Sequence, residues 1–185
     1  MTIYEELKQY AADCINGKII SCQKHKWACQ RFLRDIERVG TAEFPYVWNE
    51  DAAQNIVDWF TLLRHSKGVL AGQPIQLTTW QKFRLCQLYG WKRKSDGRKR
   101  FKKSFTEVAR KNAKSQEEAG VALYEIAVMS TRNQEVYEFY TAGVKRDQSK
   151  IVFNEAALML KGSPLRTKFK VTRDSIVHIR SQSFI

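Results

Sequence analysis

The sequence predicts an α/β fold in which helices flank a parallel β-sheet, with a helical region before it. Two stretches carry this prediction. Residues 105–109 form a short apolar, β-branched run, and a pattern at helical spacing that includes Ala119 and Leu123 follows them. Residues 135–141 alternate, and an amphipathic helical pattern follows Gly143. Strand, turn and helix thus occur twice in succession, which argues for parallel strands joined by right-handed crossovers.

The chain divides into two regions by its pattern. Residues 1–72 are expected to be the helical N-terminal region, and residues 73–185 the front part of the α/β core. The loop HSKGVLAGQP marks the division, because its two glycines and its proline interrupt the helical spacing.

The N-terminal region contains three predicted helices. Two fall within residues 2–39, and the second has Ser21 as its N-cap and Trp27 on its apolar face. The third runs from its N-cap Asn49 to His65. We expect His65 to be a cation at the end of that helix rather than a catalytic base.

The core region begins with a helix capped by Thr78 or Thr79. Residues 92–103 then predict a hairpin or loop around Asp96–Gly97, and residues 169–171 and 175–179 predict two further strands. The expected buried positions of the second strand–helix unit are Val136, Phe139, Ile151, Ala156, Leu158 and Met159.

Positive charge is concentrated in one part of the chain. The formal net charge is +13, and the segment from Lys92 to Lys114 holds 11 Lys or Arg against two acidic residues. Such a segment favours polyanions, which are nucleic acid, nucleotide phosphates or an anionic membrane. We find neither a secretory signal nor an apolar run that could span a bilayer, so a cytoplasmic protein with reduced cysteines is expected.

The junction between the first predicted strand and its helix has the residues of a phosphate loop. There Lys114 can reach the β- and γ-phosphates, and the hydroxyl of Ser115 can bind Mg²⁺, while amides at the helix start hold phosphate oxygens. The usual motif has glycine where this chain has Val108 and Ala113. A solvated basic helix start is the alternative interpretation.

Several ordered stretches extend this motif. Residues 76–83, 88–91 and 97–101 precede the loop ARKNAKS, YVWNEDAAQNIVDWFTLLRHSKG lies upstream, and YTAGVKRDQSKIVFNEAALMLKGSP lies downstream. In this order they resemble the N-terminal ATPase region of the large terminase subunit of tailed bacteriophages, over roughly residues 44 to 180. That family carries a deviant Walker A loop that contains an arginine, which Arg110 matches.

The resemblance implies a P-loop NTPase-type fold and an ATP-dependent DNA-packaging ATPase that uses ATP and Mg²⁺. Arg110 and Lys114 would be the catalytic residues, with Arg110 on or sensing the γ-phosphate, and Ser115 would hold Mg²⁺. Gln81 would contact adenine. The implied nucleotide-binding residues are Trp80, Gln81, Arg110, Lys111, Asn112, Ala113, Lys114, Ser115 and Gln116.

The resemblance also implies partners and a place of action. These are double-stranded DNA, the small terminase subunit and the portal protein, with a possible homo-oligomeric ring on the procapsid, in the cytoplasm of the infected bacterial host. The Walker B acids and the nuclease of the family would lie beyond Ile185. We therefore expect a sheet that is incomplete at the C-terminus, and a chain that alone turns over little ATP and is poorly soluble or self-associates.

Basic and polar residues outside the loop are candidates for DNA contact. The hairpin offers Arg98, Lys99 and Arg100, and the start of the second helix of the core offers Lys145, Arg146 and Gln148. Trp91 and Phe101 flank the basic hairpin and could stack on bases. A basic nucleic-acid-binding or partner-binding module without ATPase activity is the competing function.

One cysteine-rich helix face suggests a metal site. Cys22, His25 and Cys29 share a face of the second helix, but three ligands on one helix do not converge readily on one ion. Cys14 is the only evident fourth ligand. Core packing of small side chains is the favoured interpretation.

Overall fold

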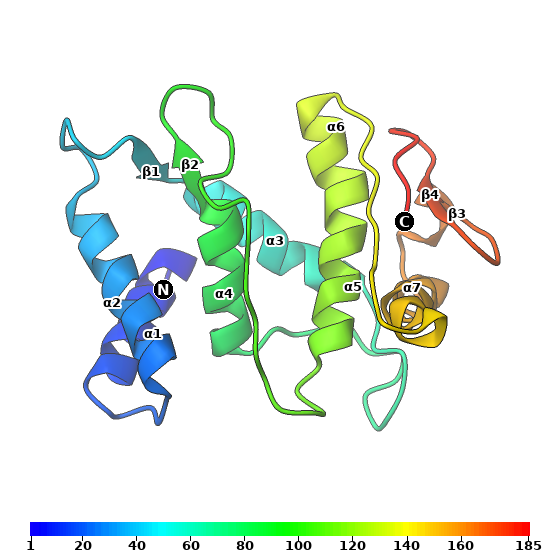
Figure 1. The fold of residues 1–185 in the computed structure, drawn as a ribbon, viewed down its shortest axis with the longest axis horizontal. Coiled ribbons are helices and arrows are strands. Elements are labelled where there is room, and N and C mark those ends of the chain that lie inside the picture. The colour runs from blue at the N-terminus through cyan, green and yellow to red at the C-terminus, as the bar shows by residue number, and fades with distance from the viewer. The chain divides into compact units, whose positions relative to one another are not determined.

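The computed structural model describes the backbone of residues 1–185 and every side chain except that of Arg146. Helices supply most of its regular structure (Figure 1). The helices are α1 (Ile3–Ile15), α2 (Gln23–Glu37), α3 (Glu50–Leu62), α4 (Thr79–Gly90), α5 (Lys114–Tyr124), the π-helical turn η1 (Glu125–Met129), α6 (Ser130–Asn133), α7 (Arg146–Lys161) and the 3₁₀ turn η2 (Arg166–Lys168). The strands are β1 (Tyr46–Trp48), β2 (Trp91–Arg93), β3 (Phe169–Val171) and β4 (Ile176–His178).

Contacts within the chain divide it into two units. The chain first passes from one unit to the other within α3, returns before α4 and leaves again after the basic hairpin. The first unit comprises residues 1–58 and 77–105, and the second comprises residues 59–76 and 106–185. These limits differ from the domain boundary that the sequence predicts between residues 72 and 73. That boundary stays a prediction.

The first unit is built from α1, α2 and α4 around a cluster of aromatic rings. Trp91 is fully buried, and its ring centroid lies 5.4 Å from that of Trp48, 5.8 Å from that of Phe44 and 6.4 Å from that of Phe32. The antiparallel pair β1–β2 places Trp48 opposite Trp91. Trp27, expected on the apolar face of α2, is 59% exposed, so that assignment was wrong.

The second unit is organised by α5, which packs against α7. Figure 1 shows α5 continuing through residues 125–129 into α6 as one long helix, with α7 beside it. The predicted inner face of α5 is confirmed, because Ala119, Ala122, Leu123 and Ile126 have no exposed surface.

The middle of this long helix contains a wider turn. Residues 125–129 are π-helical, and the backbone N–H of Ser130 donates to the carbonyl oxygen of Glu125. The hydroxyl of Ser130 donates to the carbonyl of Ile126 at 2.6 Å, and the hydroxyl of Ser181 donates to the same carbonyl at 2.8 Å. The turn thereby anchors the segment that follows β4.

Capping residues explain where two helices begin. The side-chain oxygen of Asn49 accepts a hydrogen bond from the backbone N–H of Ala52 at 2.7 Å, and Thr78 is the N-cap of α4, as predicted. The second helix differs from the prediction, since its N-cap is Cys22 rather than Ser21.

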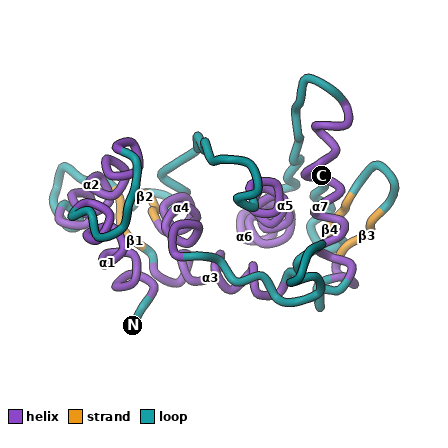
Figure 2. Tube along the Cα trace, turned by 90° about the horizontal axis from the view of Figure 1, so that it is seen from below, coloured by secondary structure: helices purple, strands orange, loops and turns teal.

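The sheet is the main difference between the prediction and the structure. The fold is a mixture of helices and strands, but only two small antiparallel sheets, β1–β2 and β3–β4, occur among the described residues. Figure 2 shows these strands in orange as isolated short pairs. Residues 105–109 form no strand, and Phe105 is 84% exposed. A strand needs a neighbour for its backbone groups, and within the described part of the chain no strand pairs with this segment.

Residues 135–141 also lack a full strand. Glu138 forms one parallel bridge with Phe184, and the N–H of Phe139 donates to the carbonyl of Phe184 at 2.9 Å. Val136 is 60% exposed, and Ile151 and Leu158 on α7 are 50% and 48% exposed, so their predicted burial was wrong. Strands 169–171 and 175–179 are confirmed in essence as β3 and β4.

Measured by length and hydropathy, no helix among the described residues could serve as a membrane span.

Candidate functional site

The backbone of the loop before α5 is sharply bent. Ala113 is the N-cap of α5 and lies in the left-handed region at φ 54° and ψ 19°. Lys111 also has a positive φ of 68°, whereas Asn112 between them is not among the positive-φ residues. Such alternation turns successive backbone N–H groups toward one side, where they can receive an anion. The alanine therefore adopts the conformation in which glycine was expected, at a cost of about 1 kcal/mol.

The loop is closed by one of its own side chains. The side-chain amide of Asn112 donates to the carbonyl of Ala109 at 3.0 Å and to that of Arg110 at 3.4 Å. The first helical hydrogen bond follows at once, from the N–H of Glu117 to the carbonyl of Ala113 at 2.9 Å. These bonds keep the carbonyls of the loop occupied and leave its basic side chains exposed.

A cavity of about 740 Å³ adjoins the loop. Its volume lies within the usual range for small-molecule sites. Every lining residue belongs to the second unit, and together they are Lys67, Gly68, Val108, Ala109, Arg110, Lys111, Asn112, Ala113, Lys114, Ser115, Gln116 and Glu155. The structure thus brings together all the predicted residues of the loop around one hollow.

The residues of the cavity outside the loop were missed from the sequence. Glu155 of α7 is 5% exposed, accepts a hydrogen bond from the hydroxyl of Ser66 at 2.5 Å and pairs with the ammonium of Lys67 at 3.7 Å. Lys67 followed by Gly68 is a weak signal of an anion-binding turn. Ser66 and Glu155 are 89 residues apart, so no local sequence pattern could predict their contact.

His65 also lies near the start of α5. Its Nδ1 is 3.2 Å from the side-chain nitrogen of Gln116. α3 ends at Leu62, so His65 stands beyond the helix whose last turn it was predicted to occupy. It links the loop after α3 to the first turn of α5.

A second, smaller cavity of about 350 Å³ lies on another side of Lys114 and Ser115. Gln148, predicted as a DNA contact, lines it together with Glu118 and Thr141. The carbonyl oxygen of Ser149 accepts a hydrogen bond from the hydroxyl of Thr141 at 2.7 Å, which joins α7 to the segment before it.

The predicted adenine residues belong to the first unit. The side-chain oxygen of Gln81 accepts hydrogen bonds from the backbone N–H of Thr78 at 3.0 Å and from its hydroxyl at 2.8 Å. Gln81 is 8% exposed, so it is a buried capping residue of α4. Trp80 is half-buried, and the guanidinium of Arg84 lies 5.2 Å from its ring centroid.

The basic hairpin forms as predicted around Gly97, whose φ is 68°. Its residues differ in what they can contact. Arg98 is exposed and Lys99 is half-buried over the ring of Tyr89, at 4.8 Å. Arg100 forms a 2.7 Å ion pair with Asp35, whose side chain is 3% exposed.

The structure changes the interpretation of the aromatic residues beside this hairpin. Trp91 is wholly buried, so the idea that it stacks on bases was wrong. The guanidinium of Arg100 lies 4.7 Å from the ring of Phe101 and 5.4 Å from that of Trp91. Arg100 therefore has a structural role, as a cation held among aromatic rings and paired with a buried carboxylate.

The start of α7 contains the other predicted DNA contacts. Lys145 is the N-cap of α7 and is exposed, and Gln148 is exposed in its first turn. The side chain of Arg146 lies outside the described part of the chain. These residues stay candidates.

Comparison with known proteins identifies the family of this chain. Residues 79–185 match the terminase large subunit, ATPase domain, and this match includes the loop, α5 and α7. Neither the curated proteins nor the solved structures contain a significant match to the chain. The matched residues make up more than half of the sequence, and the chain belongs to the family of terminase large-subunit ATPase domains.

Proposed function

We propose that this chain binds ATP with Mg²⁺ at residues 110–116 and takes part in ATP hydrolysis in a viral DNA-packaging motor. Membership of the family supports a packaging ATPase in general terms. One observation carries the specific site: the left-handed residues Lys111 and Ala113 shape the loop immediately before Lys114 and Ser115, beside a cavity.

The residues at the start of α5 fit a nucleoside triphosphate. The backbone N–H groups at the start of α5 and the ammonium of Lys114 supply positive potential for phosphate oxygens. The hydroxyl of Ser115 supplies an oxygen ligand of the kind that Mg²⁺ prefers. When bound, Mg²⁺ neutralises charge on the phosphates. The donor set and the cavity are therefore suited to ATP.

The other charged residues of the cavity have separate roles. Arg110 is exposed on the loop and can approach the γ-phosphate, where positive charge stabilises the transition state. Lys67 adds a second cation, and Glu155 holds Lys67 and Ser66 in place. Lys111, Asn112 and Gln116 complete the proposed nucleotide-binding set within the second unit. The predicted contacts of Trp80 and Gln81 with adenine are not part of this proposal, because both residues belong to the first unit and the side-chain oxygen of Gln81 already accepts two hydrogen bonds from Thr78.

The action on DNA is proposed from the family and from charge. Arg98, Lys99, Lys145 and Gln148 are the residues through which the motor would grip double-stranded DNA. Translocation into a procapsid, cutting of DNA, and work with a small terminase subunit and a portal protein in the host cytoplasm belong to the same proposal. Exposed basic side chains at the hairpin support it.

We also propose that residues 105–109 and 135–141 act as strands of a parallel sheet around α5. Their order in the chain supports this, because they flank the helix that follows the phosphate loop. Exposed apolar side chains support it as well, since Phe105 and Tyr140 are 84% and 74% exposed.

Titration with a fluorescent ATP analogue in the presence of Mg²⁺ tests the site. Lys114→Ala should weaken binding about 10- to 100-fold, because a hydrogen bond to a charged group is worth about 1.5–3 kcal/mol. Lys170→Ala is the matched control, since it removes one exposed lysine from β3 in the same unit. It should bind like the unaltered chain.

The competing function gives a different result. If Lys114→Ala and the unaltered chain bound the analogue equally, the nucleotide site would be rejected. A DNA affinity that falls steeply with salt and is unchanged by Lys114→Ala would then identify a basic binding module.

A further inference from the structure

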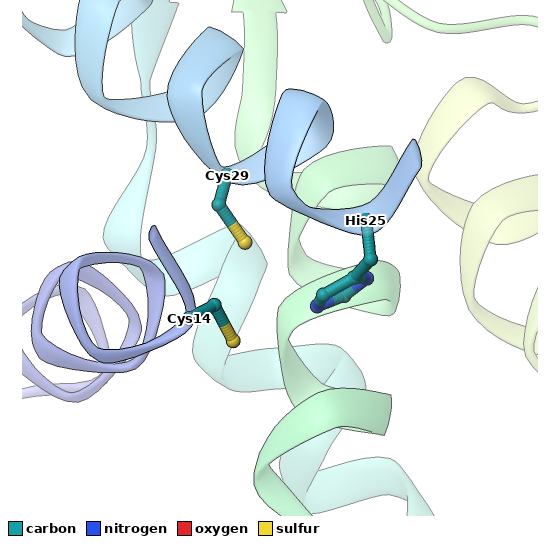
Figure 3. Close-up of side chains that lie close together, drawn as sticks. All are labelled: Cys14, His25 and Cys29. Atoms are coloured by element: carbon teal, nitrogen blue, oxygen red, sulfur yellow. The ribbon is translucent and has the colours of Figure 1, made fainter. Parts of the chain in front are cut away.

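Three metal-binding side chains meet in the first unit, where α1 packs against α2. Cys14 lies on α1, and His25 and Cys29 lie on α2. One ligand atom from each lies within 4.8 Å of the other two. Figure 3 shows the two sulfur atoms facing the same space, with a ring nitrogen of His25 turned toward them.

The structure corrects the set of ligands that the sequence suggested. Cys22 is exposed at the N-cap of α2 and takes no part in the cluster. His25 and Cys29 are four positions apart, so they lie on one face of α2, and Cys14 approaches that face from the neighbouring helix. The objection to three ligands on a single helix therefore does not apply to this set.

The two thiols of the cluster are buried, and His25 is half-buried. Cys14 and Cys29 have no exposed surface, and the ring of Phe83 lies 5.6 Å from that of His25. Two thiols and an imidazole in such a place form a donor set for Zn²⁺, which stabilises thiolates that the apolar surroundings otherwise disfavour.

An oxygen donor stands beside the three ligands. The hydroxyl of Tyr10 is 3.0 Å from the Nε2 of His25. Tetrahedral Zn²⁺ with bonds of about 2.3 Å to sulfur and about 2.0 Å to nitrogen separates its ligand atoms by about 3.5–3.8 Å. The cluster needs only a small contraction from its present spacing to reach this geometry.

We propose that Cys14, His25 and Cys29 bind one Zn²⁺ ion and leave its fourth position to an oxygen donor. The ion joins α1 to α2 and so stabilises the first unit. It lies on elements that contribute no residue to the phosphate loop or its cavity. The proposal is therefore independent of the nucleotide site.

Metal titration of the full chain tests the proposal. The reduced, metal-free chain is titrated with ZnCl₂ against a chelating dye, and bound zinc is counted by elemental analysis. We expect one tightly bound ion per chain. Cys14→Ser and Cys29→Ser should each weaken zinc binding at least about 100-fold, because the loss of a supporting outer-shell contact alone costs 10–100-fold.

The chain offers two matched controls. Cys22→Ser changes an exposed cysteine on the same helix start, and Cys86→Ser changes a buried cysteine in α4 outside the cluster. Both should retain one zinc ion with unchanged affinity. Circular dichroism of every variant establishes that its helices are formed. If a cysteine variant does not fold, His25→Asn replaces it, because His25 is half-buried and is more tolerant of substitution.

A second probe reports the ligands directly. Co²⁺ added to the metal-free chain should give the intense visible bands of a tetrahedral thiolate site, and Cys14→Ser and Cys29→Ser should abolish them. Less than one zinc ion per chain under reducing conditions would overturn the proposal. Zinc binding that survives Cys14→Ser and Cys29→Ser unchanged, or a disulfide between Cys14 and Cys29 that persists in reductant, would overturn it equally.

Discussion

The indole N–H of Trp59 donates a hydrogen bond to the carbonyl oxygen of Gly120 at 3.0 Å, and so ties the end of α3 to the middle of α5. The neighbouring ring of Phe60 packs directly over Gly120, in the space that a Cβ atom would need. Since Lys114 and Ser115 occupy the first turn of α5, this contact helps to hold the proposed phosphate loop in position.

Gly120→Ala should destabilise the second unit. Alanine favours a helix over glycine by about 1 kcal/mol, but overpacking against a fully buried ring costs about 1–3 kcal/mol. The net loss is expected to be about 1 kcal/mol, measured by urea unfolding. Gly162→Ala is the control, because its φ is −105° and the nearest atom to its new methyl group would be 3.6 Å away. Equal stability of the two variants would contradict the packing argument.

Ala113→Val should weaken nucleotide binding more than tenfold. A β-branched residue is strongly disfavoured in the left-handed region that Ala113 occupies, at a cost of about 1–3 kcal/mol, so the loop would leave its bent shape. Ala71→Val is the control, since its φ is not positive, its side chain is exposed, and it belongs to the second unit without lining any described cavity. Ala113→Gly should bind at least as well as the unaltered chain. Tight binding by Ala113→Val, in the same fluorescent titration, would mean that the bend is not needed.

Lys67→Ala should lower nucleotide affinity about 3- to 10-fold with little effect on stability. Its side chain is 84% exposed, so water screens its ion pair with the buried carboxylate of Glu155, and the pair contributes about 1 kcal/mol. Its charge nevertheless belongs to the wall of the proposed nucleotide cavity. The substitution is compared with Lys161→Ala at the end of α7, which lines none of the described cavities. Identical affinities would exclude Lys67 from the site.

Thiol reactivity should distinguish Cys22 from the other cysteines. It is exposed, whereas Cys14, Cys29 and Cys86 are buried, and burial raises the pKa of Cys86 to about 12. A thiol reagent should label one cysteine quickly in the native, reduced chain and all four after unfolding. Cys22→Ser should remove the fast phase. A second fast thiol would show that the helices of the first unit open readily.

Acid should weaken the second unit through His178. Burial, followed by the charges of Arg180 and Lys168, lowers the pKa of His178 below its usual 6.5. Between these two pKa values the unfolded chain binds more protons than the folded chain. The stability that neutral His178 contributes is therefore fully present above pH 6.5 and is lost as the pH falls toward the lower pKa of the folded chain. The urea concentration at the unfolding midpoint should fall between pH 7 and pH 5, and it should fall less in His178→Gln than in the unaltered chain. An equal fall in both proteins would contradict the lowered pKa of His178.

The sequence predicted helices better than strands, for a physical reason. Asn49 and Thr78 are local signals, because a capping side chain bonds to backbone only three residues away. A strand depends on a distant partner. Residues 105–109 have a strand-like composition, yet their backbone is unpaired in the described chain.

The same distinction separates the two candidate sites. The proposed phosphate loop is one continuous stretch, so Lys114 and Ser115 could be named as candidates from their order alone. Glu155 and Lys67 could not, because only the packing of α7 brings them together. In the cysteine cluster, helix spacing correctly placed His25 beside Cys29, but the choice of Cys14 over Cys22 needed the contact between α1 and α2.

The π-helical turn at residues 125–129 has a consequence for how this chain tolerates change. It is equivalent to one surplus residue in an otherwise regular helix, and it makes the Ile126 carbonyl an acceptor for Ser181, 55 positions away. Removing one residue here would restore a regular helical turn, in which the Ile126 carbonyl accepts a backbone N–H of the helix itself, while the helix on either side keeps its direction. Such a deletion would thus weaken the hydrogen bond from Ser181 and loosen the segment after β4 from the helix that begins at Lys114.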